Sequence, residues 1–280
     1  MRVRGEESPG LATASAVLAG SLVLAVATLA AAAEHPLSAC KDAGASFATV
    51  EAVGARDGAT VRLADGRELR LAGVLAANEL DGDDTAMRRA TAALDALVSG
   101  KRLALYGKPD GKDRYGRLIA QAALADEPRW IAAELVARGE LRVAPEAGAP
   151  ACTESLLVHE RAARAAGLGL WADPRFAVQD ANALDALLAA AGRFAVVEGT
   201  VLRVGESGRR LFLDFGARYS RDFTVVVPRT ARAAFEAAGV DLKQARGKRV
   251  RARGVLYVWG GPALDVSGPA AIEFLPESGS

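Results

Sequence analysis

The sequence predicts a mainly β protein with added helices, in which two small β-barrels follow one another along the chain. The chain has 280 residues, enough for about two domains that each bury a core of their own. Short alternating runs of hydrophobic and polar residues are separated by Asp-Gly pairs, a pattern typical of β-hairpins. Three strands, a helix and two further strands are expected in each half, and this repeated order favours two barrels.

Composition excludes several classes of protein. Hydrophobic residues make up 51% of the chain and charged residues 25%, which excludes a disordered tail protein, a collagen and a coiled coil. The 35 Lys and Arg residues are balanced by 34 Asp and Glu residues, so phosphate recognition has to be local rather than a property of bulk charge. Two cysteines and two histidines are too few for a zinc site.

The N-terminus has the pattern of a secretory signal. Two arginines precede an uncharged run at 11–33 that ends in three alanines, which predicts a signal peptide at 1–33 and a mature N-terminal segment at 34–46. The protein is then expected to be periplasmic or secreted. Two alternatives stay open: residues 11–33 are long enough to anchor an uncleaved chain in the membrane, and residues 37–40 resemble a lipoprotein processing box.

Export places the two cysteines in an oxidising environment. We therefore expect a disulfide between Cys40 and Cys152, which would tie the mature N-terminus to the start of a helix more than 100 residues away. The alternative is a pair of unbonded, buried cysteines. Neither cysteine lies near a base-like residue in a setting that indicates catalysis.

The first half, residues 47–175, is expected to form a five-stranded barrel of the OB type with helical additions. The helix after the third strand shows apolar residues at helical spacing and a glycine just beyond its end. The expected strands are 48–53, 60–63, 68–71, 102–106 and 118–124, and the expected helices are 84–98, 130–137 and 154–166.

A linker and a second OB-like barrel complete the chain. Asp173 and Pro174 end the first half, the linker at 176–192 contains an alanine-rich helix at 181–191, and the second barrel covers 193–277. Its expected strands are 194–204, 211–215, 223–227, 249–259, 263–266 and a short 272–275, with a helix at 231–238 after the third strand.

Several short motifs in the first half are similar to those of a known enzyme family. They are Asp57-Gly58-Ala59-Thr60, Arg70-Leu71-Ala72-Gly73-Val74, Asp113-Arg114-Tyr115-Gly116-Arg117, and two glycine-containing stretches at 135–139 and 169–171. In this order they resemble the staphylococcal nuclease, or thermonuclease, family over about residues 47–171. The resemblance implies calcium-assisted phosphodiester hydrolysis, in which carboxylates hold the ion, another carboxylate activates water and two arginines stabilise the phosphate.

The resemblance assigns the phosphate-stabilising role to Arg70 and Arg117. A guanidinium group suits this role because it can donate two hydrogen bonds to phosphate and stays charged near neutral pH. The alternative is that both arginines are ordinary solvated or ion-paired residues.

The acidic half of the family site is largely missing. Ala59 and Leu75 stand where the family has its two calcium-binding aspartates, and Asn78 stands where it has the glutamate base. A methyl group, an isobutyl group and a neutral amide cannot do the work of carboxylates, so no metal is expected and hydrolysis should be weak or absent. Calcium is expected only if the site is functional, with Glu79 as a possible base after a shift of one residue.

An acidic cluster follows these positions and consists of Glu79, Asp81, Asp83 and Asp84. It could recruit a divalent ion through a rearranged loop. A solvated loop whose last two aspartates favour the start of the following helix explains the same residues more simply.

Positive charge is concentrated in the second half. Between residues 193 and 277 there are 14 basic and 9 acidic residues, whereas residues 47–175 carry 18 basic and 19 acidic ones. Strand alternation would place Arg251, Arg253, Tyr257 and Trp259 on one face, a combination that suits single-stranded nucleic acid. The alternative is that the aromatic residues fill the barrel and the arginines are its solvated exterior, in a structural or protein-docking domain.

These observations predict an exported thermonuclease-like protein that binds nucleic acid or another phosphate-bearing polymer and hydrolyses it weakly or not at all, that is, a pseudoenzyme. Two other functions stay open. One is an active calcium-dependent nuclease outside the cytoplasm, and the other is a scaffold that binds a protein partner through its second barrel.

Overall fold

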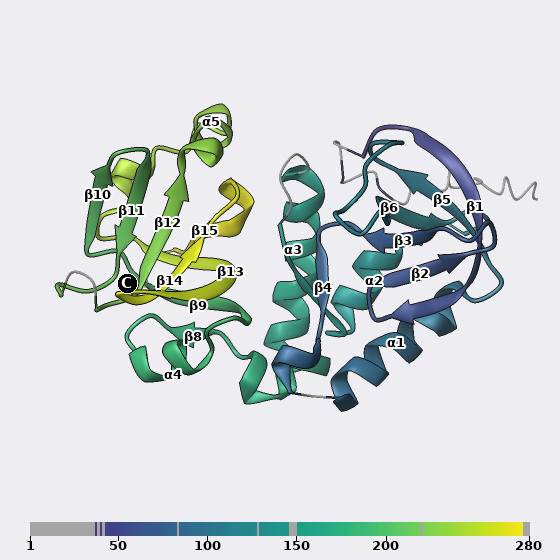
Figure 1. The fold of residues 1–280 in the computed structure, drawn as a ribbon, viewed down its shortest axis with the longest axis horizontal. Helices are drawn as coiled ribbons and strands as arrows, with labels where there is room; N and C mark the ends of the chain where they lie inside the picture. The colour runs from purple at the N-terminus through teal and green to yellow at the C-terminus, as the bar shows by residue number, and fades with distance from the viewer. Residues whose placement is uncertain are drawn as a thin grey trace, which may run out of the picture. The chain divides into compact units, whose positions relative to one another are not determined.

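The computed structural model describes Leu37, Cys40 and residues 43–82, 84–127, 129–145, 150–218 and 221–276 (Figure 1). Residues 34–280 group into one compact unit. The signal peptide expected at 1–33 lies outside the described residues, so export and membrane anchoring stay predictions. Within the described ranges, no helix is both long and apolar enough to span a bilayer.

The first half contains the five strands expected from the sequence. They close into a barrel in the order β1-β2-β3-β6-β5, in which β3 and β6 are parallel and the other neighbours antiparallel. The strands are β1 (Ser46–Asp57), β2 (Thr60–Leu63), β3 (Glu68–Leu71), β5 (Arg102–Tyr106) and β6 (Leu118–Leu124). Register shifts at bulges bend β1, so it pairs with β5 at its start and with β2 at its end.

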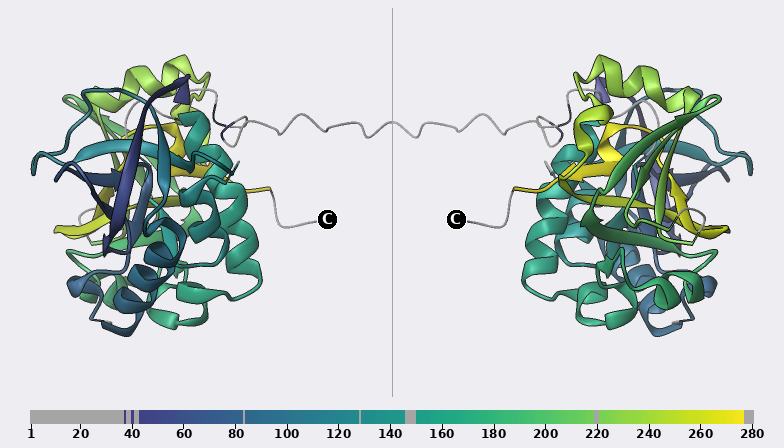
Figure 2. Two further views of the ribbon diagram at one scale, coloured as in Figure 1. Left: turned by 90° about the vertical axis from the view of Figure 1, so that its right-hand side faces the viewer. Right: turned by 90° about the vertical axis from the view of Figure 1, so that its left-hand side faces the viewer.

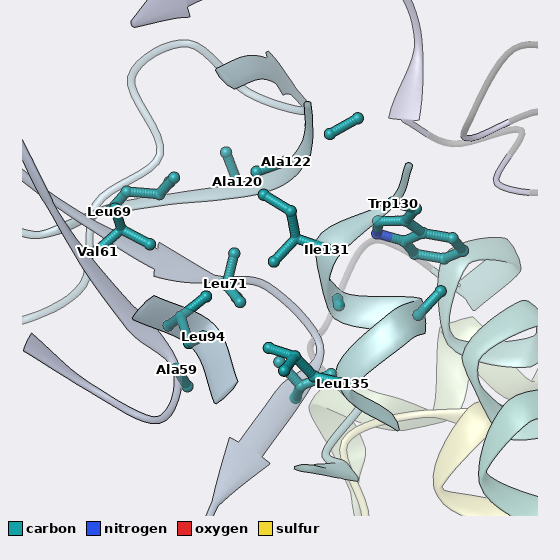
Figure 3. Close-up of a cluster of buried hydrophobic side chains, with 14 of the residues drawn as sticks. Ala59, Val61, Leu69, Leu71, Leu94, Ala120, Ala122, Trp130, Ile131 and Leu135 are labelled. Atoms are coloured by element: carbon teal, nitrogen blue, oxygen red, sulfur yellow. The ribbon is translucent and has the colours of Figure 1, made fainter. Parts of the chain in front are cut away.

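The barrel core is apolar and is closed by helices. Alternate residues of β3 are buried, as expected for a strand with one face toward a core, and in β2 only Arg62 is exposed. Helix α1 (Asp84–Val98) lies below the strands in Figure 1 and in the left view of Figure 2. Figure 3 shows how Leu71 of β3, Leu94 of α1 and Leu135 of α2 (Ile131–Ala137) gather in one cluster.

A two-stranded sheet outside the barrel was not expected from the sequence. It pairs β4 (Val74–Ala76) with β7 (Leu141–Val143), so that Leu75 lies opposite Arg142. Strands of three residues are too short to show the alternation on which strand prediction depends.

The two glycine-containing motifs of the first half contact each other. Gly139 follows α2, and Gly169 begins the 3₁₀ helix Gly169–Ala172; both have positive φ, at 71° and 57°. The amide of Leu170 donates to the carbonyl oxygen of Gly139 at 2.8 Å. A Cβ atom on Gly139 would lie 2.2 Å from the carbonyl oxygen of Leu168, so the two backbones can approach this closely only when a glycine is present.

The expected disulfide is confirmed. Cys40 and Cys152 are bonded and buried, 112 residues apart in sequence. Cys152 lies in α3 (Pro150–Ala165), so the bond joins the segment before β1 to the first turn of this helix.

The second half forms one mixed sheet in the order β10-β11-β12-β14-β13-β9-β8, with β15 also paired to β13. Helices α4 (Leu184–Ala189) and α5 (Arg229–Ala237) accompany it. The strands are β8 (Gln179–Asp180), β9 (Phe194–Thr200), β10 (Arg203–Ser207), β11 (Arg210–Asp214), β12 (Thr224–Pro228), β13 (Arg249–Trp259), β14 (Gly261–Asp265) and β15 (Ile272–Phe274).

This order is closely related to that of the first barrel. The single strand expected at 194–204 is divided into β9 and β10, which only Val201 and Leu202 separate. When β9 and β10 are counted as one bent strand, the path from β10 to β9 has the same order as the first barrel. Closure of these strands into a second barrel stays a prediction.

Candidate functional site

The two arginines that the resemblance singles out meet around Thr60. Arg70 of β3 lies directly opposite Thr60 of β2, and residues opposite each other on paired strands share a face. Arg117 follows the loop before β6, and its Nη1 donates to Oγ1 of Thr60 at 3.2 Å. Both arginines therefore neighbour Thr60, Arg70 by strand register and Arg117 by a hydrogen bond.

Asp113 fixes the position of Arg117. Nε of Arg117 donates to Oδ2 of Asp113 at 2.7 Å, and the backbone amides of Tyr115 and Arg117 donate to Oδ1 at 2.9 and 3.0 Å. Burial alone would raise the pKa of Asp113, but the hydrogen bonds from Arg117 and Tyr115 outweigh it and hold the pKa below its ordinary value. An ionised Asp113 thus holds the Arg117 guanidinium in one orientation.

Both arginines keep donors that no described residue uses. Nη1 of Arg70 donates to the carbonyl oxygen of Leu71 at 2.7 Å, and Arg117 uses Nε and Nη1. Among the described residues, no partner is found for Nη2 of either arginine. Two fixed guanidinium groups with remaining N–H donors are suited to bind an oxyanion such as phosphate.

Tyr115 adds an exposed aromatic ring beside the arginines. Its side chain is 67% exposed, and the guanidinium carbons of Arg114 and Arg117 lie 4.8 and 5.4 Å from its ring centre. Nη2 of Arg114 also donates to the Tyr115 hydroxyl at 2.7 Å. The sequence alone assigned no role to Thr60 or Tyr115, although both lie within the motifs, because strand register and loop geometry decide what they touch.

The positions expected to hold calcium ligands carry no carboxylate. Ala59 is buried among the apolar side chains of the barrel core (Figure 3). Leu75 is half-buried in β4, and Oδ1 of Asn78 accepts a hydrogen bond from the amide of Leu80 at 2.9 Å. Calcium prefers six or more oxygen ligands, so this donor set does not fit the ion. Within the described ranges, no three His, Cys, Asp or Glu side chains are grouped to hold a metal.

The acidic cluster is divided by the structure. The backbone of Glu79 begins the 3₁₀ helix Glu79–Asp81, but its side chain and the whole of Asp83 lie outside what the structure describes. Asp81 is buried: Oδ2 accepts from Nη2 of Arg142 at 3.1 Å and from the amide of Asn78 at 3.0 Å. Asp84 is exposed and begins α1, as the helix-start alternative requires. The expectation that Asp81 belongs to a solvated acidic loop is wrong, because this carboxylate is paired inside the protein.

The nucleic-acid surface expected on β13 is not formed, although alternation does place its four residues on one side of the strand. Arg253 is fully buried, with Nη1 donating to Oε1 of Glu160 at 2.8 Å and Nη2 donating to Oε1 of Glu273 at 2.6 Å. Glu160 belongs to α3 and Glu273 to β15, so elements from elsewhere in the chain cover this face. The prediction that Arg253 contacts a nucleic acid is therefore wrong.

The other three residues differ from one another in exposure. Arg251 is 14% exposed and pairs with Glu198, whose Oε2 lies 3.0 Å from its Nε. The hydroxyl of Tyr257 donates to Oδ1 of Asp265 at 2.6 Å, and burial together with this bond raises the pKa of Tyr257. Only Trp259, at 46% exposure, presents much of its side chain to solvent. The sequence shows alternation along a strand but not which elements pack on it, so this outcome could not be predicted.

Comparison with known proteins found one similarity in the first half. Residues 69–173 match the family model described as staphylococcal nuclease homologue, which supports that family for this part of the chain. The match includes Arg70 and Arg117 and ends just after Trp171. No curated protein matches the chain.

Proposed function

We propose that the nuclease-like domain binds the phosphodiester backbone of nucleic acid and does not hydrolyse it efficiently. The observation that carries this proposal is the convergence of Arg70 and Arg117 on Thr60, in a site whose expected carboxylate positions are Ala59, Leu75 and Asn78.

Binding is supported by charge and by shape. The remaining N–H donors of Arg70 and Arg117 match the oxygens of a phosphate group, and their positive charge is favourable beside a polyanion. Tyr115 offers an exposed ring on which a neighbouring base can stack, an interaction that tolerates any sequence. The proposed ligand is therefore a single strand, whose bases are free to reach the ring.

Weak hydrolysis follows from the missing carboxylates. Phosphodiester cleavage needs an activated water molecule and a group that offsets the charge developing on phosphate. Arg70 and Arg117 can supply the second requirement. The neutral amide of Asn78 cannot accept a proton from water, and Ala59 and Leu75 offer no oxygen ligands for calcium, so the chain binds and orients the phosphate without a base beside it.

The proposal is tested with a fluorescent thymidine oligonucleotide at low salt. Arg70→Gln and Arg117→Gln are each expected to weaken binding by about tenfold and to reduce its salt dependence. Arg102→Gln is the matched control. It removes the same charge from an exposed arginine of β5, which pairs with Asp126. Absence of binding, or an equal loss in the control, would contradict the proposal.

Hydrolysis is measured on the same oligonucleotide with and without calcium. We expect no calcium-dependent cleavage above that of the Arg70→Gln variant. Robust cleavage that requires both calcium and Arg70 would instead establish the alternative of an active nuclease, with Glu79 the first residue to examine as its base.

We also propose that the protein acts outside the cytoplasm. The N-terminal pattern and the Cys40–Cys152 disulfide support this location, since disulfides persist mainly in oxidising compartments. Mass spectrometry of the native protein is expected to find a mature chain that begins at Glu34. A cytoplasmic protein that retains residues 1–33 would overturn the proposal.

A further inference from the structure

We propose that a pocket on the C-terminal sheet binds an uncharged carbohydrate chain. This pocket has a volume of about 470 Å³ and lies over β10, β11 and β12, beside the turn between β13 and β14. It is separate from the arginine site of the nuclease-like domain, and the inference does not depend on the proposed function.

An aromatic platform forms one wall of the pocket. Trp259, at the end of β13, stacks on Phe212 of β11 with ring centres 5.6 Å apart and ring planes 26° apart. The guanidinium carbon of Arg210 lies 5.9 Å from the indole centre. These two contacts fix the orientation of Trp259 while 46% of its surface stays exposed. A fixed, exposed indole is suited to pack against the flat C–H face of a sugar ring.

Fixed polar groups lie next to this platform. Oδ2 of Asp214 accepts from Nε and Nη2 of Arg203 at 2.9 and 2.8 Å, and Oδ1 accepts from the hydroxyl of Thr224 at 3.1 Å. Asp214 is only 8% exposed whereas the Arg203 side chain is 53% exposed, so the carboxylate is held in place while the guanidinium group faces solvent. Sugar hydroxyls both donate and accept hydrogen bonds, and a rigid set that contains donors and acceptors side by side complements them.

The charges around the pocket favour an uncharged ligand. Each carboxylate that lines it has an arginine partner: Asp214 pairs with Arg203, Glu206 with Arg232 at 2.6 Å and Asp222 with Arg218 at 3.6 Å. Asp214, Glu206 and Asp222 line the pocket, and among the described residues Arg203 is the one lining arginine. Because every lining carboxylate is already paired, neither a phosphate backbone nor a cation would find an uncompensated opposite charge here.

A glycine leaves space for the ligand. Gly205 of β10 lies opposite Phe212, and a Cβ atom built on it would meet no other atom within 4 Å. A valine at this position would extend into the pocket without a backbone clash, and valine is favourable in a strand. Gly205→Val therefore blocks the site while leaving the fold intact.

Tryptophan fluorescence of the full chain provides the test. The other two tryptophans, Trp130 and Trp171, are 6% and 8% exposed, so a ligand-induced change in emission reports on Trp259. The probes are the hexasaccharides of cellulose, chitin and amylose, each titrated to about 10 mM, a range suited to weak sites. At least one probe is expected to shift the emission to shorter wavelength along a saturable curve.

Three variants decide the interpretation. Gly205→Val and Trp259→Ala are expected to weaken binding by about tenfold or more when it is measured by calorimetry. Val258→Ala is the matched control, because Val258 neighbours Trp259, is 58% exposed and projects from the opposite face of β13. Circular dichroism confirms that each variant is folded.

The possible outcomes are distinct. If none of the three sugars changes the emission, or if Gly205→Val responds as the native protein does, the proposal is overturned. A thymidine oligonucleotide that binds in place of the sugars and is blocked by Gly205→Val would make the pocket a nucleic-acid site and also overturn it. Arg70→Gln should leave sugar binding unchanged, so failure of this inference is separable from failure of the proposed function.

Discussion

At the residue scale, Ala59 and Thr60 are neighbours that serve different parts of the molecule. Ala59 belongs to the apolar core of the barrel, whereas the hydroxyl of Thr60 accepts a hydrogen bond from Arg117 beside Arg70. The position where the resemblance expects a calcium ligand is therefore a packing position in this chain. A carboxylate there would have to be buried among the side chains drawn in Figure 3.

The variant Ala59→Asp tests this interpretation. Burial raises the pKa of a carboxyl group in the folded state, so the cost of folding grows as the pH rises above the unfolded value of about 4. We expect a loss of at least about 2 kcal/mol in the free energy of unfolding at neutral pH, and a much smaller loss near pH 4. Thermal unfolding at the two pH values measures the difference.

Ala64→Asp is the control, because Ala64 is exposed in the hairpin turn after β2. A loss that is equal at both pH values, or that calcium reverses, would contradict the assignment of Ala59 to the core.

Residue types alone predicted part of the candidate site. The motifs assigned Arg70 and Arg117 to one site, and each of them neighbours Thr60. The roles of Thr60 and Tyr115 depend instead on strand register and on the loop that Asp113 organises. The burial of Arg253 could not be predicted, since it results from an α-helix more than 80 residues earlier in the chain.

At the element scale, close contacts between short backbone segments fix how the helices pack beside the barrel. The contact between Gly139 and Leu170 joins the end of α2 to the 3₁₀ helix that follows α3. The longer strands and helices were predictable from their periodicity. The β4–β7 pair and the division between β9 and β10 were not, because three-residue strands have no period and the bend at Val201 leaves the apolar pattern unbroken.

Gly139→Ala is expected to be strongly destabilising. The substitution combines a strained positive φ with a clash against the backbone of Leu168, and we expect a loss of about 3 kcal/mol. Gly66→Ala separates the two effects, since Gly66 also has positive φ but open space around it, and it should cost about 1 kcal/mol. Denaturant unfolding measures both variants, and equal losses would show that the close approach is unimportant.

At the scale of the whole molecule, a buried ion pair and a hydrogen bond from an arginine to the backbone join the two halves. Arg253 of β13 contacts Glu160 of α3, and Nη1 of Arg142 in β7 donates to the carbonyl oxygen of Phe194 in β9 at 2.9 Å. A buried ion pair adds little to the free energy of unfolding when it is compared with well-packed apolar residues of similar volume. Removing one partner is costly, however, because it leaves the other charge buried and uncompensated.

Arg253→Met is expected to lower the free energy of unfolding by about 3 to 5 kcal/mol, because Glu160 is fully buried and loses its main cation. Arg56→Met is the control: Arg56 is 55% exposed and pairs with Glu68, and an exposed pair contributes about 1 kcal/mol or less. Guanidinium unfolding curves compare the variants. A loss for Arg253→Met no larger than that of the control would contradict the importance of the buried pair.

Glu273 makes the same network sensitive to acid. Burial favours a higher pKa for Glu273, but the charges and hydrogen bonds of Arg253, Arg161 and Arg251 outweigh it and lower the pKa below its ordinary value. The stabilisation is therefore present above the unfolded pKa of about 4 and is lost as the pH falls through the folded value. Glu273→Gln should reduce stability at neutral pH and flatten its decline in acid, which unfolding at a series of pH values will measure.

The buried pair between Arg253 and Glu160 also limits how the two halves of the chain can be separated in protein engineering. Cutting the chain near Gly192 would leave Glu160 on one fragment and Arg253 on the other. Arg253 would keep its pair with Glu273, whereas Glu160 would keep only the longer contact with Arg164 at 3.4 Å. Transplanting the nuclease-like half into a fusion protein would first require replacing Glu160 with an uncharged residue of similar size.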